Sequence, residues 1–442
     1  MSVVRGGMSG SRRRALAIVF GVVFLDLLGF SIVIPILPFY ARAFGGNELV
    51  IGALAATYSL FQFISAPYLG SLSDRYGRRP VLVFSLCGSV LAWTIFGLAG
   101  SLTVLFLARG LAGAMGGNIA TAQAYVADVT PPERRAKALG LLGAAFGLGF
   151  IVGPGVSAAL TLPGVVESVD AALPAIVPID RFSLPAFAAA FASLLAVFGA
   201  LAFLPESRER DDSVTDRPSQ AAELRTALAN PGLRGLVAAF FLFSFAFSGV
   251  QVMFIPYVAD VYGYAEAQAA LLLTYIGVLA VVVQGGLIGP LTDRYSSTRL
   301  TVFGAGLLAV ALFCIPFTRE FGVLFPDLTG AVGFLTPALL ALLVVLGLLS
   351  LGNGVLGVTL TALVSGQASD DRQGSAFGIT QGAGSLARTV GPVSMGALYA
   401  GLGYQSPFVL GAILLLPVVA IALYLRVGDT GEPRPSDPSH AR

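Results

Sequence analysis

The sequence predicts an all-α membrane protein with twelve transmembrane helices in two similar six-helix bundles. Three observations lead to this fold class. Hydrophobic residues make up 56% of the 442 residues and charged residues only 11%, whereas a soluble protein of this size needs far more charge to cover its surface. The apolar residues gather in runs long enough to cross a bilayer, which takes about 20 residues. Short motifs of the first half also return in the second half.

Twelve apolar runs are candidate transmembrane spans. They cover residues 15–41, 50–70, 80–100, 102–127, 138–160, 183–204, 234–259, 267–290, 300–317, 336–364, 376–401 and 407–426. A charged segment separates the sixth run from the seventh. The resulting division is a first bundle at 1–204, a cytoplasmic linker at 205–233, a second bundle at 234–426 and a disordered cytoplasmic tail at 427–442. Within the linker we expect a short amphipathic helix near Ala221–Ala229.

The positions of the basic residues predict the orientation in the membrane. With the N-terminus in the cytoplasm, only three of the 26 Lys and Arg residues lie in outside loops, namely Arg42, Arg181 and Arg319. Arg109 and Arg388 lie within spans, and all the others are cytoplasmic. This asymmetry satisfies the positive-inside rule with both termini inside. We therefore expect a multi-pass protein of the inner (plasma) membrane, in contact with membrane lipids.

The two halves of the chain are repeats of each other. The segment GSLSDRYGRRPVL at Gly70–Leu82 returns as GPLTDRYSSTRL at 289–300, 219 residues later, and Gly45 matches Gly263 at an offset of 218. Six spans repeated head to tail are the plan of one large class of transporters. Because an even number of spans preserves orientation, both charged loops face the cytoplasm.

The first charged loop resembles the loop signature of the major facilitator superfamily, GxLaDrxGrk. LARGLAGAMGG in the fourth span resembles the family's RxxxG signature, and GLLGAAFGLGFIVGPGVSAAL in the fifth resembles the exporter signature. LDLLGFSIVIPILP in the first span and FLPES after the sixth fit as well. The resemblance covers nearly the whole chain. It points to the drug:proton antiporter branch with twelve spans, near the tetracycline exporters, and implies the major facilitator fold with alternating access.

The charged loop is expected to act in gating. Asp74 can accept backbone N–H groups at the N-terminus of a neighbouring helix. Arg75, Arg78 and Arg79 can reach lipid phosphates or acids at nearby helix ends. Such contacts can hold two bundles together on the cytoplasmic side and then release. The resemblance implies that the loop stabilises the outward-facing state, and the alternative is an ordinary positive-inside loop.

The second copy of the loop is expected to be the weaker half of this latch. Ser296 and Ser297 replace the Gly and Arg that the signature places after the tyrosine. The gating residues predicted in the two loops are Gly70, Asp74, Arg75, Gly77, Arg78, Asp293 and Arg294.

Three residues of the fifth span are added to the gating set. Pro154 removes one intrahelical hydrogen bond and bends the helix. Gly149 and Gly153 are four residues apart and make a flat face for close helix contact. Such a face can seal two halves against leak, and plain helix packing is the alternative.

Charged residues within spans are functional candidates, because a charge at mid-bilayer costs several kcal/mol. Asp26 lies near the middle of the first span and is predicted to be the proton-coupling carboxylate. Arg109 in the fourth span could meet Asp26, and the resemblance implies that it takes part in proton handling. The alternative is a static pair between Asp26 and Arg109 that fixes helix packing only.

Polar residues of other spans are candidates for substrate binding, although each can instead bond between helices. The predicted set is Asn118, Gln251, Asn353 and Arg388, and Gln62, Gln284 and Gln381 are further candidates. For Arg388 the alternative is to cap backbone carbonyls freed near Gly391 and Pro392. Ala92 and Ala280 stand where the tetracycline exporters carry an acid and a histidine. These departures argue against a tetracycline–metal complex as the substrate.

The sequence carries no signature of an enzyme, of nucleic-acid binding, of a cofactor or of a metal site. Cys87 and Cys314 are expected to be buried thiols rather than a disulfide, and the single histidine, His440, lies in the polar tail. The favoured function is proton-coupled efflux of a small amphipathic compound or drug by a monomer. The alternatives are a facilitator or importer of a sugar-like solute or metabolite, and a non-transporting membrane receptor or scaffold.

Overall fold

The computed structural model describes residues 10–174, 176–207, 231–330, 332–367 and 373–429, and within these ranges the chain is helical, without a strand. The helices of the first half are α1 (Gly10–Val33), α2 (Leu37–Ala43), α3 (Glu48–Tyr76), α4 (Arg78–Gly97), α5 (Leu102–Gly116), α6 (Asn118–Val129), α7 (Pro132–Leu160), α8 (Pro163–Ala172) and α9 (Ser183–Phe203). Those of the second half are α11 (Pro231–Tyr262), α12 (Glu266–Val282), the π-helical η1 (Val283–Leu287), α13 (Ile288–Arg294), α14 (Ser297–Cys314), the 3-10 helix η2 (Ile315–Phe317), α15 (Thr318–Phe321), the 3-10 helix η3 (Gly322–Leu324), α16 (Pro337–Gln367), α17 (Gln373–Leu402) and α18 (Ser406–Asp429).

Eleven helical segments within the described ranges are long and apolar enough to cross a membrane. The remaining predicted span, 376–401, coincides with α17. This helix has the length of a span, with 30 residues, but it is not among the eleven. Polar side chains such as Gln381, Ser385 and Arg388 lower its hydropathy. Counting α17 as the twelfth transmembrane span therefore rests on its length and on its place in the repeat.

Several predicted boundaries differ from the structure. The span predicted at 102–127 consists of α5 and α6, which are separated at Gly117. The span predicted at 267–290 contains the π-helical turn η1, a rare feature that is frequent at functional sites. The α8 helix had no counterpart in the predicted elements. The chain predicted as a tail from residue 427 is helical to Asp429, and the predicted Ala221–Ala229 helix lies outside the described residues.

The expectation that both cysteines are buried is wrong. The Cys87 side chain is exposed and that of Cys314 is partly exposed, and both thiols are free. Both residues lie in apolar spans, where a thiol that faces lipid costs little because cysteine behaves as a small hydrophobic residue.

The chain packs as two compact units. Unit 1 comprises residues 1–217, 248–278 and 388–407, and unit 2 comprises residues 218–247, 279–387 and 408–442. Unit 1 thus combines the first six spans with parts of α11, α12 and α17 from the second half of the chain. This division by packing differs from the sequence division at the linker.

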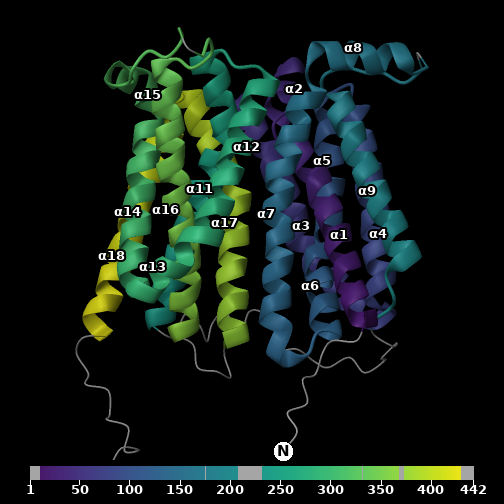
Figure 1. The fold of residues 1–442 in the computed structure, drawn as a ribbon, viewed down its shortest axis with the longest axis horizontal. Helices are drawn as coiled ribbons and strands as arrows, with labels where there is room; N and C mark the ends of the chain where they lie inside the picture. The colour runs from purple at the N-terminus through teal and green to yellow at the C-terminus, as the bar shows by residue number, and fades with distance from the viewer. Residues whose placement is uncertain (1–9, 175, 208–230, 331, 368–372, 430–442) are drawn as a thin grey trace, which may run out of the picture. The chain divides into compact units, whose positions relative to one another are not determined.

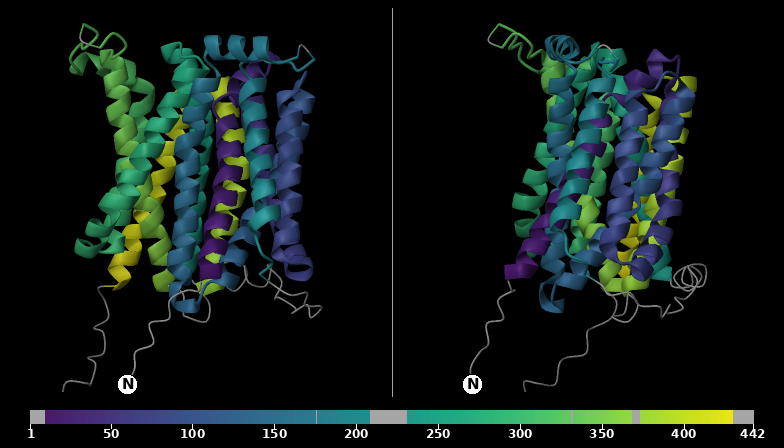
Figure 2. Two further views of the ribbon diagram at one scale, coloured as in Figure 1. Left: turned by 45° about the vertical axis from the view of Figure 1, so that its right-hand side comes forward. Right: turned by 90° about the vertical axis from the view of Figure 1, so that its right-hand side faces the viewer.

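In unit 1, α1 packs lengthwise against α7 and α9, and α4 packs against α9 (Figures 1 and 2). Helix α8 lies across the end of this bundle (Figure 1). The two ends of unit 1 are named here after the glycines that flank α3: the Gly45 end, which also carries α2, and the Gly77 end. Both glycines have a positive φ, +78° and +99°, which favours glycine. Gly263, the repeat counterpart of Gly45, shares this feature with a φ of +69°.

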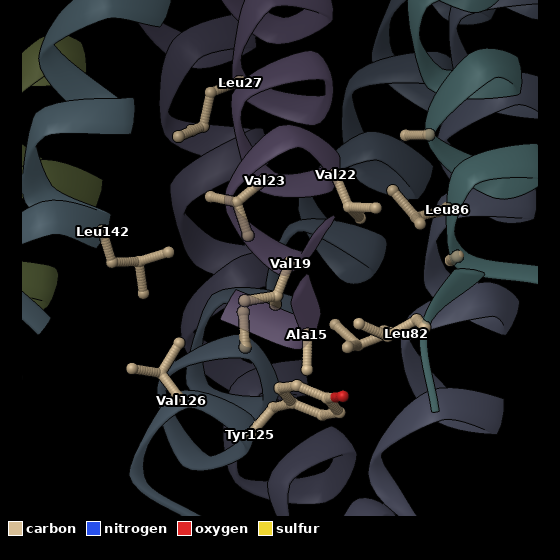
Figure 3. Packing of buried hydrophobic residues seen from close by; sticks show 14 of the residues in the cluster. Ala15, Val19, Val22, Val23, Leu27, Leu82, Leu86, Tyr125, Val126 and Leu142 are labelled. Carbon is tan, nitrogen blue, oxygen red and sulfur yellow. The ribbon is translucent and has the colours of Figure 1, made fainter. Parts of the chain in front are cut away.

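The half of α1 nearer the Gly77 end lies in an apolar cluster contributed by α1, α4, α6, α7 and α9 (Figure 3). Val19, Leu86 and Val126 are among its fully buried members. In a bilayer such packing is held by dispersion contacts rather than by exclusion of water. The cluster fixes the position of α1, and therefore of Asp26, which lies on that helix between the cluster members Val23 and Leu27.

Unit 2 contains a close pair of helices, α14 and α16. Gly304 and Gly352 allow their backbones to approach, because a Cβ on Gly304 would lie 2.8 Å from the Leu356 nitrogen. The hydroxyls of Thr301 and Thr359 bond to each other across the same interface at 2.9 Å. Small residues with an interhelical hydrogen bond are typical of packing between membrane helices.

Candidate functional site

Asp26 stands in the middle of α1, between the apolar cluster members Val23 and Leu27. Asn118 Nδ2 donates a hydrogen bond to Asp26 Oδ2 at 3.1 Å, and the Ser89 hydroxyl is a second hydrogen-bonding group beside the carboxylate. Asn118 is buried and is the first residue of α6, directly after Gly117. A carboxylate placed in an apolar bundle thus has two polar partners from α4 and α6.

A cavity of about 10 Å³ adjoins the Asp26 carboxylate, which is roughly enough space for one water molecule. Apart from Asp26 and Asn118 its walls are apolar. They consist of Val22, Val23, Leu27, Leu82, Leu86, Ile119 and Ala122. Most of these apolar residues belong to the apolar cluster, so the cavity lies between the carboxylate and that cluster's side chains.

Arg109 lies buried on α5 among aromatic rings. Its Nε donates to the backbone carbonyl of Leu54 at 3.3 Å. The guanidinium carbon lies 4.7 Å from the centre of the Tyr58 ring and 5.8 Å from that of Phe30, and these rings are 4.6 Å apart. Such cation–π contacts contribute about 2 kcal/mol when desolvated. Among the described residues the cation is therefore stabilised by rings and a carbonyl, without a carboxylate.

Among the described residues no ion pair joins Asp26 to Arg109, so the direct contact that we expected is not formed. Tyr58 interacts electrostatically with both groups and lies beside Arg109. Gly113 and Gly116 allow this arrangement, because a Cβ on Gly116 would lie 2.5 Å from the Tyr58 hydroxyl and one on Gly113 would overlap the Tyr58 backbone. The two charges thus share an aromatic neighbour instead of a salt bridge.

The Gly77 end of unit 1 carries a second polar cluster. The Glu206 carboxylate accepts hydrogen bonds from the backbone nitrogens of Arg78 at 2.8 Å and Arg79 at 3.0 Å. It therefore caps the N-terminus of α4, where unsatisfied N–H groups and the helix dipole favour an anion. The Arg79 guanidinium donates to the carbonyls of Ala200 and Leu201 near the end of α9. Capping of a helix N-terminus was expected of Asp74, and here Glu206 performs it.

Arg78 is the buried centre of this cluster, with an exposed fraction of 5%. Its guanidinium lies 2.8 Å from Asp74 and 3.0 Å from Asp128, and it donates to the Ser73 hydroxyl at 2.6 Å. Arg75, by contrast, lies over the ring of Tyr76. The Arg78 side chain therefore ties the connection between α3 and α4 to the end of α6.

Replacing Gly77 with alanine should destabilise this end of the protein. The φ of +99° is unfavourable for any residue with a Cβ, and the new atom would lie 2.6 Å from Glu206 Oε2. We expect a cost of about 1–3 kcal/mol and a lower melting temperature of the purified protein in detergent. Gly21→Ala is the matched control, because a Cβ at Gly21 meets nothing within 4 Å. Equal melting of the Gly77→Ala variant and the wild type would contradict the expectation.

The glycine face predicted on the fifth span packs within the first half of the chain. Gly149 and Gly153 of α7 lie against α1, where a Cβ on Gly149 would be 3.0 Å from Leu27 and one on Gly153 would overlap Ser31. The Ser31 hydroxyl donates to the Gly149 carbonyl at 2.7 Å. In the described structure this face, with Pro154 one residue further along, therefore fixes α7 to α1.

The other predicted site residues lie apart from Asp26. Gln251 on α11 and Arg388 on α17 have exposed side chains. On α16, the Oδ1 atom of Asn353 is buried without a hydrogen-bond partner in the described part of the chain. Asp293 and Arg294 end α13 with exposed side chains, and Gly70 lies within α3. Of the residues predicted for proton coupling and substrate binding, the structure brings Asp26 and Asn118 into contact.

Ser89, Asp128 and Glu206 are residues of these clusters to which the sequence assigned no role. Glu206 belongs to the FLPES segment, which resembles the family pattern, so this segment carried a signal. Ser89 and Asp128 carried none, because a serine or an aspartate at these places has no distinctive neighbour in the sequence.

A family model described as Major Facilitator Superfamily matches residues 19–341 and 322–441. This chain belongs to the major facilitator superfamily. The transporter is 31% identical over 404 residues to the tetracycline resistance protein, class G, of Vibrio anguillarum, covering 89% of this chain and 93% of that protein. The resemblance and the all-α membrane fold class predicted from the sequence are thereby confirmed, with eleven candidate spans in the described part of the chain against the twelve predicted.

Solved structures support the same assignment. The human organic anion transporter MFSD10 is similar with a TM-score of 0.63 and 24% identity, over 93% of this chain and 99% of that one. A bacterial homologue of the human lysosomal transporter Spinster has a TM-score of 0.71 and 15% identity, over 96% of both chains. At these identities the likeness shows the fold. The chain is thus a multi-pass membrane protein of a transporter family.

Proposed function

We propose that this major facilitator protein exports a small amphipathic compound in exchange for protons, by alternating access. The observation that supports this most strongly is Asp26, a carboxylate in the middle of a transmembrane helix with Asn118 as its hydrogen-bond partner. An ionised carboxylate costs several kcal/mol at this depth, and the protonated form costs far less. Gain or loss of one proton at Asp26 therefore changes the free energy of every conformation in which this side chain is buried.

Asn118 and Arg109 would adjust this proton site in different ways. The Asn118 amide can donate to an ionised carboxylate or accept from a protonated one by rotating its side chain. Arg109 would act through Tyr58, which lies beside it. A bound substrate that displaces this ring would alter the field at both charges. Substrate and proton would then favour different conformations, which is the requirement for exchange.

We further propose that the Gly77 end lies in the cytoplasm and the Gly45 end outside. The basic residues Arg75, Arg78 and Arg79 at the Gly77 end support this orientation under the positive-inside rule. In this orientation both termini would face the cytoplasm, and we propose that the protein acts as a monomer in the inner membrane. The likeness to a tetracycline resistance protein supports efflux as the direction, with a small molecule as the substrate.

Inverted membrane vesicles that contain the protein will test the proposal. We expect an imposed proton gradient, acid inside, to drive accumulation of a fluorescent amphipathic cation, and an uncoupler to abolish it. Vesicles without the protein are the control. Transport that proceeds equally with and without the gradient would instead identify a facilitator, and the absence of any flux in reconstituted liposomes would favour a receptor or scaffold.

A second candidate substrate is an organic anion. Among the described residues, Arg109 has no carboxylate partner and is held by rings and a carbonyl. The likeness to the human organic anion transporter MFSD10 points in the same direction. Transport of a fluorescent carboxylate and of the cationic probe should be compared in the same vesicles. Preferential transport of the carboxylate would identify organic anions, rather than amphipathic cations, as the substrate class.

A further inference from the structure

At the Gly45 end of unit 1, residues from both halves of the chain meet in a charged cluster. Arg42 of the first half forms two hydrogen bonds with Asp260 of the second half, each 2.8 Å long. Arg42 also donates to Glu48 at 2.7 Å. The hydroxyl of Tyr399 donates to Asp260 at 2.6 Å. The paired, parallel geometry between Arg42 and Asp260 is the strongest arrangement for this type of ion pair.

Arg42 and Asp260 occupy equivalent positions of the internal repeat. They are 218 residues apart, the same offset as that between Gly45 and Gly263, and each lies three residues before its glycine. The repeat thus carries opposite charges at matching places, and the two places meet. This ion pair therefore joins the two repeats at equivalent positions.

A second ion pair connects the two halves at the same end. Glu266 is buried at the start of α12, and its carboxylate lies 3.4 Å from the Arg181 guanidinium, in the segment before α9. Glu266 is the repeat counterpart of Glu48, again at an offset of 218. Each of these two acids therefore faces an arginine of the first half.

Glycines beside these ion pairs bring helices of the two halves into backbone contact. A Cβ on Gly52 of α3 would overlap the carbonyl of Pro392 on α17, and one on Gly396 of α17 would overlap the carbonyl of Glu48. On α12, a Cβ on Gly277 would lie 2.9 Å from Ile151 of α7. No side chain could enter these contacts without a shift of the backbone. The described structure is therefore closed here, between α3 and α17 and between α7 and α12.

We propose that Arg42, Asp260 and Tyr399 form the latch of the external gate, which holds this end closed and must break for substrate to leave. The proposal rests on the proposed function for its direction and for alternating access. Glycine contacts supply the close fit, and the ion pair supplies a contact that exists only in the closed form.

The exposure of the latch suits repeated opening. The side chains of Arg42 and Asp260 are 27% and 40% exposed, so water can solvate both charges when they separate. A fully buried ion pair would leave two uncompensated charges on opening, at a high cost. Burial lowers the pKa of Arg42, but its hydrogen bonds to Asp260 and Glu48 outweigh this and raise the pKa. The arginine therefore stays charged, and opening requires separation rather than its deprotonation.

A single reporter cysteine tests the latch. Thr274 of α12 lies in the contact between α7 and α12, 3.6 Å from the Cβ position of Gly155. We would introduce Thr274→Cys into a chain that carries Cys87→Ala and Cys314→Ala. Its reaction with a membrane-impermeant maleimide would then be timed on intact cells and on inverted vesicles. The variants are Asp260→Asn, Tyr399→Phe and Gly396→Ala. Gly401→Ala is the matched control on α17, because a Cβ there meets nothing within 4 Å.

We expect Asp260→Asn to accelerate labelling from outside by about tenfold, because loss of charge-assisted hydrogen bonds shifts a population by at least that factor. Gly396→Ala should give a similar acceleration, because its Cβ would overlap the Glu48 carbonyl and force the helices apart. Tyr399→Phe should give a smaller acceleration, and Gly401→Ala none. Unchanged labelling in both Asp260→Asn and Gly396→Ala would overturn the latch. Acceleration only in inverted vesicles would overturn its external position.

The labelling experiment separates the latch from the proposed function. Maleimide labelling needs neither substrate nor a proton gradient. Accelerated labelling without proton-driven transport would therefore retain the latch and reject the exchange mechanism, and the reverse combination would retain exchange and reject the latch. If Asp260→Asn fails to fold, as judged by gel filtration in detergent, Tyr399→Phe and Gly396→Ala decide the result.

Discussion

Replacing Asp26 with asparagine should abolish proton-driven export while the protein still exchanges substrate across the membrane. Asparagine keeps the size of the side chain and can bond to Asn118, but it cannot take up a proton. We expect accumulation in inverted vesicles to fall to that of vesicles without the protein. Substrate counterflow, in which one substrate gradient drives another without protons, should persist. Both assays on the same vesicle preparation provide the measurement.

Two further variants make the Asp26 result specific. Asp26→Glu retains a carboxyl group and should keep part of the proton-driven export. Asp170→Asn removes an exposed acid of α8 and should leave export unchanged. If Asp26→Asn vesicles accumulate substrate as well as the wild type does, Asp26 is not the coupling group and the static role of this residue is favoured.

Hydropathy predicted the position of most spans because the bilayer imposes length and apolarity on each of them. It did not predict where a span breaks. Both sides of Gly117 are apolar, so a window of about 19 residues averages across the break between α5 and α6. The π-helical turn η1 is invisible for the same reason. Such interruptions depend on packing with neighbouring helices, which one sequence does not contain.

The site was predictable as far as charge in an apolar run reveals it. Asp26 and Arg109 stood out because ionisable residues within spans are rare. Their relative rotation did not follow from the sequence, which assigns a residue to a helix but not to a partner. Tyr58 could not be distinguished as their shared neighbour, because the chain has 13 Tyr and 31 Phe residues. Contacts over long separations, such as that between Glu206 and Arg78, require the fold.

The internal repeat carries a further signal in its charges. Arg42 and Asp260 occupy equivalent positions, with opposite charge, near helix ends that the repeat makes similar. A comparison of charges at matching positions of the two halves would have selected this pair. In repeats related by a pseudo-two-fold axis, equivalent positions near the axis lie close together, so opposite charges there indicate contact.

Arg78→Gln should lower the free energy of unfolding more than most single substitutions at the Gly77 end. Glutamine keeps one donor group but removes the charge between Asp74 and Asp128. Breaking a buried ion pair costs about 3–5 kcal/mol. Here the side chains of both acids are partly exposed, at 27% and 29%, so water can solvate them when Arg78 is replaced. We therefore expect a loss of stability of about 2 kcal/mol. The melting temperature of the purified protein in detergent should fall accordingly.

The comparison of Arg78→Lys with Arg75→Gln shows whether the geometry of the Arg78 side chain matters as well as its charge. Lysine restores the charge but not the planar set of donors that serves Asp74, Asp128 and Ser73 together, so we expect Arg78→Lys to recover only part of the stability. Arg75→Gln removes a charge from the same loop that contacts the ring of Tyr76, and its melting temperature should stay near that of the wild type. Equal losses for Arg75→Gln and Arg78→Gln would show that the loop needs positive charge alone. In that case added salt should also lower the melting temperature of the wild type. Salt screens contacts between exposed charges far more than it weakens the buried contacts of Arg78.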